Sequence, residues 1–372
     1  MQIPPFELER YFARYEFSAR YLLSSSDCEA LTLAALLGMA DDQNRRLWDE
    51  LKLSYTESPG HPRLRKAIAG LYQGLDVEDT LVVTPEEGIF LSMHALLKPG
   101  DHVVCTFPGY QSLYEIPRAI GCNVSTWEPT EVNGWQFDLD RLATLLRDDT
   151  RLVVVNFPHN PTGALPRPEA FEALIDLLRQ RGVYLFCDEM YRYLEFEPAT
   201  TLPAACERYE RAVTLAGLSK AYGLPGLRIG WLVSRDRDLI ARTAQLKDYT
   251  TICASAPSEI LAIMALDNRE AIVARQIERL RTNLEGLVRF MADHEDSFHW
   301  QRPQGGSICF PGLRRPEGAQ AFCRTLVEKT GIMLLPATPF QYGDRHVRIG
   351  FGRNNFPEVL HRFGDYLSMA DR

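Results

Sequence analysis

Short apolar segments that alternate with helical patterns, between about residues 60 and 235, constrain the fold of this chain more than any other feature. Six segments have the length and the Val, Leu and Ile content of buried strands: Thr80–Thr84, His102–Thr106, Leu152–Asn156, Tyr184–Cys187, Ala212–Ala216 and Ile229–Val233. Three of the helical patterns beside them are Gly88–Leu97, Tyr110–Ile120 and Glu169–Gln180. Because fully apolar strands must be covered on both faces, the alternation predicts an α/β fold with a mostly parallel sheet between helices.

A change of pattern after Asp248 predicts a second, smaller domain. Its helical patterns are Pro257–Leu266, Glu270–His294 and Ala319–Lys329. The β-rich segments FHWQRP, SICFPG, MLLPAT and HVRIGFG predict a separate small sheet. The first forty or so residues have no sheet of their own, so we expect them to pack against this C-terminal part. The predicted organisation is a large α/β domain over residues 46–255 and a smaller α+β domain made of residues 1–45 with 256–372.

The composition excludes several classes of protein. Acidic residues outnumber basic ones by 49 to 41 and no basic block occurs, so we expect no nucleic-acid partner. No apolar run reaches the roughly eighteen residues of a membrane span, so we expect no membrane association. The start, MQIPPFELER, has charged residues where a signal peptide has an apolar stretch, which predicts a cytoplasmic protein. Eight scattered cysteines without a CxxC pair predict reduced thiols, with neither a zinc site nor a disulfide framework.

The most specific segment for chemistry is Gly217–Trp231, GLSKAYGLPGLRIGW. Lys220 lies there in a short loop between two apolar strands, and Arg228 follows eight residues later. A lysine that is shielded in such a loop is suited to Schiff-base chemistry with a carbonyl compound. Taken alone, Lys220 also fits an exposed loop lysine, which is the commoner case.

Two further polar segments follow predicted strands directly. Asn160 lies in the turn sequence FPHNPTGAL, at a strand end where open α/β sheets bind ligands. Asp188 begins CDEMYRY after the next buried strand, and a buried carboxylate needs a cationic partner to stay ionised. Each also has an ordinary structural reading, since Asn160 fits a simple turn and Asp188 fits a helix N-cap.

Taken together, Asn160, Asp188, Tyr191, Lys220 and Arg228 have the order and spacing of the fold-type I pyridoxal-phosphate enzymes. The chain resembles the class I/II aminotransferases, in which NPTG is followed by an Asp with a Tyr three residues later, and then by SK with an Arg eight residues after the Lys. The resemblance implies a large domain with a sheet of the seven-stranded type, and pyridoxal 5′-phosphate as the cofactor.

The resemblance extends over nearly the whole chain. Tyr55 with LRKAIA resembles a family segment near the N-terminus, FPGY resembles a strand end that closes with Tyr110, and HVRIGFG carries Arg348 where the family has a C-terminal arginine. The family implies a homodimer with shared active sites, in which Tyr55 reaches the cofactor of the second subunit. Arg348 would bind the α-carboxylate of the substrate through two hydrogen bonds.

The family also implies a role for each residue around the cofactor. Lys220 would hold it as an internal aldimine and then move the proton of the substrate. Asp188 would pair with its ring nitrogen. The remaining implied contacts are the phenolic oxygen for Asn160 and Tyr191, the ring face for Tyr110, and the phosphate for Ser219, Arg228 and the helix start at Glu87 and Gly88.

Two departures from the family pattern leave questions open. Glu86 and Glu87 stand where the family usually has a Gly- or Ser-rich turn, and two carboxylates beside a phosphate would repel it, so at least one must point away or meet a cation. The run Ser24–Cys28 is similar to the capreomycidine-synthase branch, which dehydrates and cyclises a hydroxylated arginine. We read this run equally as a helix-capping loop and as a substrate loop that contains Ser26.

The function that these patterns predict is transfer of the α-amino group of an L-amino acid to a 2-oxo acid. An elimination or cyclisation lyase that acts on a hydroxylated arginine-like amino acid is the alternative with the same cofactor. The segment CDEMYRY keeps the ordinary aminotransferase pattern, which favours transamination. Two other classes fit poorly: an effector-binding regulator would carry a DNA-binding segment, and a dinucleotide-dependent dehydrogenase would have GxGxxG after a strand.

Overall fold

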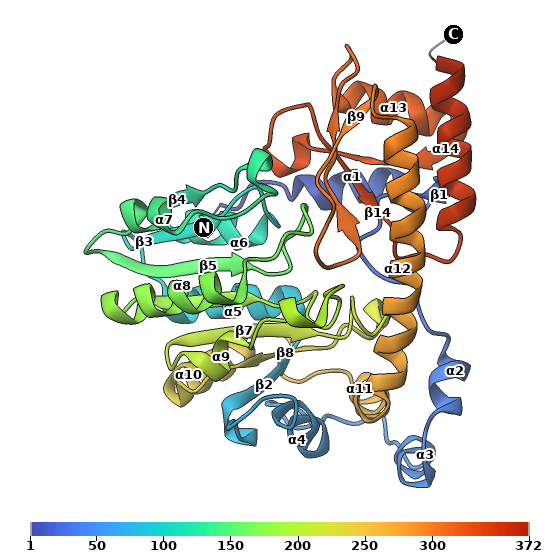
Figure 1. The fold of residues 1–372 in the computed structure, drawn as a ribbon. Coiled ribbons are helices and arrows are strands. Elements are labelled where there is room, and N and C mark those ends of the chain that lie inside the picture. Colours follow the sequence, from blue (N-terminus) through green and yellow to red (C-terminus); the bar gives the residue numbers. More distant parts are fainter. Residues whose placement is uncertain (1, 371–372) are drawn as a thin grey trace.

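A sheet of seven strands is the main element of the computed structural model, which describes residues 2–370 (Figure 1). The strands are β2 (Thr80–Val83), β3 (His102–Thr106), β4 (Asn123–Trp127), β5 (Thr150–Asn156), β6 (Tyr184–Asp188), β7 (Ala212–Gly217) and β8 (Gly230–Val233). Their order across the sheet is β2-β8-β7-β6-β5-β3-β4. Within this sheet only β8 runs antiparallel to its neighbours. The predicted α/β fold of the fold-type I class is confirmed.

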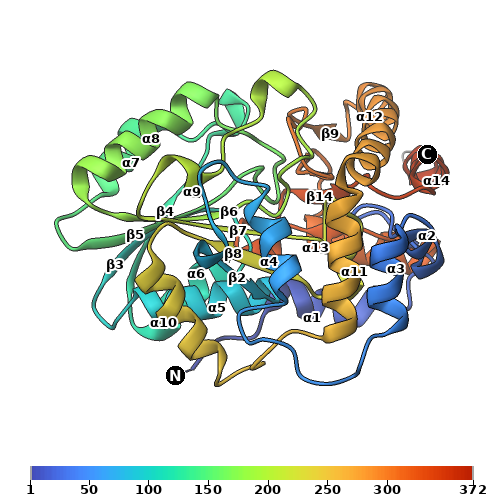
Figure 2. The same ribbon diagram turned by 90° about the horizontal axis from the view of Figure 1, so that it is seen from below.

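Helices cover both faces of the sheet because its strands are apolar on both sides. In β5, Leu152 and Val154 pack in one cluster with side chains of α5, α6 and α10, whereas Val153 and Val155 pack in a second cluster with α7 and α8. Successive side chains of a strand point to opposite faces, so one strand serves both layers. Figure 2 shows the two groups of helices on opposite sides of the strands. The helices around the sheet are α4 (Pro62–Ala69), α5 (Pro85–Leu96), α6 (Ser112–Ile120), α7 (Leu139–Leu145), α8 (Pro168–Arg181), α9 (Ala205–Arg208) and α10 (Arg237–Lys247).

The C-terminal part consists of long helices and very short strands. The expectation of one small sheet is wrong, because the strands form three separate pieces: β1-β12, β10-β14-β13 and β11-β9. Pro311 separates β10 from β11, and proline has no N–H with which to continue a ladder. The helices are α11 (Ala256–Asp267), α12 (Arg269–Asp293), α13 (Ala319–Thr330) and α14 (Phe356–Ala370). The strands are β9 (Phe298–His299), β10 (Ile308–Cys309), β11 (Gly312–Leu313), β12 (Ile332–Met333), β13 (Leu335–Pro336) and β14 (Val347–Gly350).

The N-terminal segment lies against this C-terminal part (Figure 1). In it, β1 pairs in parallel with β12 through Tyr21 and Ile332, and α2 and α3 contact α11. The elements of the segment are α1 (Glu7–Tyr15), β1 (Tyr21–Leu22), α2 (Leu33–Gly38) and α3 (Asp42–Asp49). The domain boundaries at residues 45 and 255 stay a prediction.

Two local differences from the sequence-based expectations have simple physical causes. Helix α5 begins at Pro85, three residues before the predicted start at Gly88, because proline suits the first helical position and Glu86 and Glu87 suit the positive end of the helix dipole. Strand β4 was not predicted, since it is an edge strand with mostly half-exposed, polar residues. Among the described residues, no helix is long and apolar enough to cross a membrane.

Candidate active site

A cavity of about 680 Å³ lies beyond the carboxyl ends of the parallel strands and receives most of the residues that the sequence singled out. Nine residues with a predicted cofactor or substrate role line it: Ser26, Tyr110, Asn160, Asp188, Tyr191, Ser219, Lys220, Arg228 and Arg348. A larger hollow of about 1020 Å³, beside α4 and α12, contains none of these residues. We take the smaller cavity as the candidate active site because the ionisable groups converge there.

Strand order explains why distant motifs meet in this cavity. Asn156 and Asp188 end the paired strands β5 and β6 in direct register, and Lys220 follows β7, the next strand across the sheet. Arg228 precedes β8, which runs in the opposite direction, so its start lies at the same edge as the ends of the others. The sheet therefore presents an acid, a lysine and an arginine on one rim.

Lys220 is half-buried and faces the N-terminal segment. Its Nζ donates a hydrogen bond to Ser26 Oγ at 2.7 Å and lies 5.6 Å from the centre of the Tyr191 ring. The position of Ser26 is fixed in turn, because the hydroxyl of Ser307 donates to its carbonyl oxygen at 2.6 Å. The run Ser24–Cys28 thus supplies a side chain that contacts the central lysine.

Asp188 is buried, with 5% of its surface exposed. Burial raises its pKa to about 7, against the opposing effects of a hydrogen bond from the backbone N–H of Met190 and of the charge on Lys220. A buried carboxylate whose pKa is raised is stabilised when a cationic group lies against it. The cavity therefore favours a ligand that carries a protonated nitrogen at this end.

Arg348 lies on β14 with only 1% of its surface exposed. Its guanidinium donates to Asn160 Oδ1 at 3.2 Å and to the carbonyl oxygen of Ser24 at 2.8 Å. Burial lowers the pKa of Arg348, because no carboxylate pairs with it among the hydrogen bonds and ion pairs of the described residues.

Three buried polar atoms of the cavity have no hydrogen-bond partner in the part of the chain described: Arg348 Nε, the Tyr191 hydroxyl oxygen and Ser25 Oγ. Since buried polar atoms are normally satisfied, these three point to a polar ligand in the cavity.

The start of α5 and the Lys220 loop form the opposite end of the cavity. Ser219 is buried and Arg228 is exposed, and both line the cavity. The first turn of a helix offers backbone N–H groups to an anion, and the first such groups here belong to Glu86 and Glu87, since residue 85 is a proline. The N–H of Gly88 already donates to the carbonyl oxygen of Thr84, so it continues the helix instead.

The two glutamates at this helix start point in different directions. The carboxylate of Glu87 does not line the cavity; it accepts hydrogen bonds from the backbone N–H of Thr84 and from the hydroxyls of Thr250 and Thr251. Glu86 lines the cavity and accepts from Ser112 Oγ at 3.3 Å, and burial raises its pKa. The repulsion of an anion by these two side chains is therefore reduced, because one turns away and the other is shifted toward its neutral form.

Tyr55 is not brought to the cavity of its own chain. It lies in the loop between α3 and α4 with 86% of its surface exposed, and Tyr249, in the loop after α10, is 90% exposed. Their two loops touch, since Ser58 Oγ donates to Asp248 at 3.0 Å.

The sequence did not single out several residues that line the cavity. Among them, Leu8, Glu9 and Phe12 lie on α1 and Glu16 directly follows it, at spacings of one helix face, which is a signal of burial but not of function. Arg353 also lines the cavity and forms an ion pair with Asp27 at 2.8 Å.

Comparisons with known proteins agree with this geometry. The family model for aminotransferases of class I and II matches residues 23–363. Capreomycidine synthase of Streptomyces vinaceus is 32% identical over 354 residues, which cover 94% of this chain and 90% of that protein. The structure of a PLP-dependent aminotransferase from Streptococcus suis is 30% identical, covers all of both chains and has a TM-score of 0.94. The structure of the PLP-dependent cyclase OrfR is also 30% identical, over 98% of each chain, with a TM-score of 0.89.

Proposed function

Because this chain belongs to the aminotransferase class I and II family of pyridoxal-phosphate enzymes, we propose that it moves the α-amino group of an L-amino acid to a 2-oxo acid. The observation that carries the proposal is the convergence of Lys220, Asp188 and Arg348 on one cavity. The similar proteins include both aminotransferases and a cyclase, so similarity alone does not select the reaction, and transamination is our proposal.

The residues of the cavity fit pyridoxal 5′-phosphate. Lys220 would hold the cofactor through its amine. Asp188, whose pKa is raised by burial, would pair with the protonated ring nitrogen. The Tyr191 hydroxyl, which has no partner among the described residues, would donate to the phenolic oxygen together with Asn160. Ser219, Arg228 and the first turn of α5 would hold the phosphate. When bound, the cofactor supplies an electron sink for the charge that develops at the substrate Cα.

Lys220 and Arg348 would divide the work on the substrate. Arg348 has a free Nε beside two engaged Nη atoms, and it would bind the α-carboxylate in place of its present contacts, which orients the Cα–H bond. Lys220 Nζ, once free, would take the proton from Cα as a general base. Ser26 Oγ, which accepts from this Nζ at 2.7 Å, would keep the amine directed into the cavity.

We also propose a homodimer in which Tyr55 of the partner subunit completes the phosphate site. The support is an exposed apolar surface formed by two touching loops, on which Leu53, Tyr55 and Tyr249 are 87%, 86% and 90% exposed. Large apolar side chains that gather on a surface commonly mark an interface. The proposed location is the cytoplasm, which suits the eight free thiols of the chain.

A second candidate function, elimination or cyclisation on a basic, hydroxylated amino acid, is favoured by the charge of the cavity wall. Asp27 forms an ion pair with Arg353, but Glu9 and Glu16 line the cavity without an ion pair among the described residues. Burial and the like charges of Asp27 and Glu9 raise the pKa of Glu16. An acidic cavity wall suits a cationic side chain such as a guanidinium. The same proton transfer by Lys220 would then be followed by loss of a leaving group from the substrate side chain.

One experiment separates the two candidates. The purified holoenzyme is mixed with single L-amino acids, with and without a hydroxyl on Cβ or Cγ, and the bound cofactor is followed by absorbance while products are identified by mass spectrometry. Transamination predicts conversion of the cofactor to its amine form and a matching 2-oxo acid from an amino acid without a leaving group. Loss of water from a hydroxylated arginine, with no amine form from any unsubstituted amino acid, would replace our proposal with the second candidate.

A further inference from the structure

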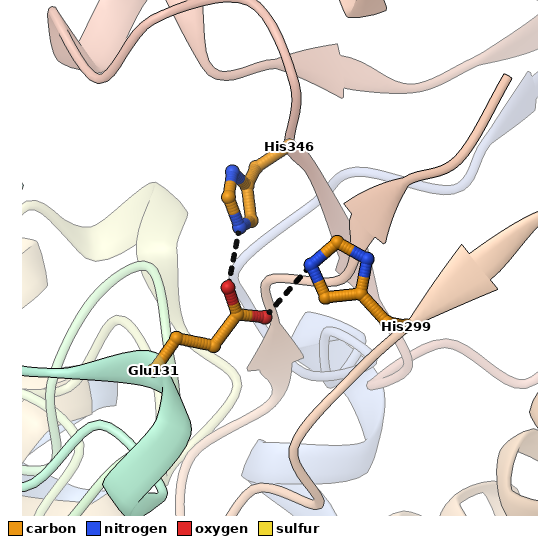
Figure 3. A group of neighbouring side chains, drawn as sticks. All are labelled: Glu131, His299 and His346. Atoms are coloured by element: carbon orange, nitrogen blue, oxygen red, sulfur yellow. Dashed lines mark hydrogen bonds and ion pairs between the residues drawn. The ribbon is translucent and has the colours of Figure 1, made fainter.

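Three ionisable side chains outside the active-site cavity converge on one point, as Figure 3 shows. Glu131 lies in the short 3₁₀ helix η2 (Glu131–Asn133) between β4 and α7, His299 ends β9, and His346 directly precedes β14. The Nε2 atom of His346 is 3.1 Å from one carboxylate oxygen of Glu131, and that of His299 is 3.3 Å from the other. None of the three lines the cavity that contains Lys220.

The donor set is that of a transition-metal site. Two imidazoles and one carboxylate are a common zinc ligand set, and such sites often keep a fourth position for water. The three ligand atoms lie within 4.8 Å of one another. Tetrahedral zinc with bonds of about 2.0–2.2 Å requires ligand atoms about 3.3–3.6 Å apart. The two histidines contact different oxygens of Glu131, so a small rotation of the carboxylate would present one oxygen to an ion that both histidines bind.

The surroundings hold the two imidazoles in these positions. The His346 ring stacks on Phe310 with centroids 5.0 Å apart and contacts the edge of Trp135 at 5.7 Å. The His299 ring lies directly over Gly312, where any side chain would collide with it. Ligands that are fixed before a metal arrives lose less conformational entropy when they bind it.

Access also suits a cation. The side chain of His299 is 40% exposed, which leaves one side of the group open to water and to an entering ion.

We propose that Glu131, His299 and His346 bind one divalent transition-metal ion of the zinc type, with water as the fourth ligand. The ligands come from elements 168 and 47 residues apart in sequence, and only the fold brings them together. The bound ion joins the segment after β4 of the large sheet to two strands of the C-terminal part. Its expected effect is on stability, because the site is separate from the cavity of Lys220.

The test uses the holoenzyme after treatment with a chelator and dialysis. Zn²⁺ is titrated by calorimetry, and Co²⁺ is used as a probe because its tetrahedral complexes absorb visible light at longer wavelengths than the cofactor does. The expected result is one ion per chain, a visible Co²⁺ spectrum typical of tetrahedral coordination, and a rise in the unfolding temperature with Zn²⁺.

His346→Gln and Glu131→Gln should each weaken Zn²⁺ binding at least tenfold and abolish the tetrahedral Co²⁺ spectrum. The matched control is His361→Gln, which removes an exposed histidine that lies 3.8 Å from Asp365 on α14 and should leave binding unchanged. The cofactor content of each variant shows whether it has folded, and Glu131→Gln keeps the test valid if the His346 variant is unstable. Absence of stoichiometric binding by the wild type, or equal binding by the wild type and by folded Glu131→Gln, would overturn the proposal.

Discussion

Replacement of Asp188 by Asn should stabilise the cofactor-free protein while it removes activity. Asp188 is buried, and burial raises its pKa from 3.8 to about 7. A carboxyl group whose pKa is higher in the folded than in the unfolded state lowers stability as pH rises between the two values. The cost is absent below about pH 4, grows by about 1.4 kcal/mol per pH unit, and levels off above about pH 7 at roughly 4 kcal/mol. Asn Oδ1 can still accept the hydrogen bond from the N–H of Met190.

The assay is thermal and denaturant unfolding of the cofactor-free wild type and Asp188→Asn at pH 5 and pH 8. The variant should be the more stable protein at both values, and its advantage should grow by about 3 kcal/mol from pH 5 to pH 8. Added cofactor should stabilise the wild type more than the variant, because the ring nitrogen supplies the cation that Asp188 lacks. Turnover by the variant should fall by about 100-fold or more, which is about 3 kcal/mol of transition-state stabilisation.

A neighbouring carboxylate that has a cationic partner supplies a control. Burial raises the pKa of Glu189 as well, but Glu189 pairs with Arg192 at 3.4 Å and its charge acts to raise the pKa of that arginine. Glu189 also accepts a hydrogen bond from the backbone N–H of Ala205 at 2.8 Å. Glu189→Gln should destabilise the protein by about 3 kcal/mol, because it leaves the arginine without its counter-charge. If cofactor-free Asp188→Asn is no more stable than the wild type at pH 8, or if its advantage is the same at both pH values, the inferred burial cost at Asp188 is wrong.

Three further predictions concern the roles of single residues. Borohydride reduction of the holoenzyme followed by peptide mapping should find the cofactor on Lys220, and a label on any other lysine would refute that assignment. Arg348→Lys should raise the KM for the amino acid about 10- to 100-fold with a smaller effect on kcat. A single ammonium would lose one of the two charge-assisted hydrogen bonds to the α-carboxylate, and such a bond contributes about 1.5–3 kcal/mol. An unchanged KM would mean that Arg348 does not bind the α-carboxylate. Mixed dimers of Tyr55→Ala and Lys220→Ala should recover activity that neither parent has, and hybrids that are shown to form but stay inactive would mean that Tyr55 does not act across the interface.

The sequence predicted the sheet well, because buried parallel strands leave a strong local signal. The run LVVVN in β5 has no polar residue before its last position, and every position of β6 and β7 is buried. The sequence pattern does not predict strand β4, because an edge strand needs no apolar run. Its residues Asn123 to Thr126 are exposed or half-exposed. The sequence pattern predicts one sheet for the small C-terminal strands, because a local pattern does not specify which short strands pair.

The candidate site was predictable only where its residues sit in family motifs. Lys220, Asp188 and Asn160 lie in motifs that have the same order along the chain as in the family, and the structure brings them together in one cavity. Glu9 and Glu16 carry no such pattern, since they enter the cavity only because α1 packs across it. The sequence also gives no sign that Glu131, His299 and His346 form a group, because they lie in three separate segments of the chain.

The fate of the substrate's α-nitrogen tests the central claim most directly. The holoenzyme is given an L-amino acid labelled with ¹⁵N at the α position together with an unlabelled 2-oxo acid, and the products are analysed by mass spectrometry. Transamination through Lys220 predicts that the label appears in the amino acid formed from the 2-oxo acid, one atom for each 2-oxo acid produced from the donor, and that Lys220→Ala forms none. Label that stays in a cyclised product or is released as ammonia, with no labelled amino acid formed from any acceptor, would contradict the account.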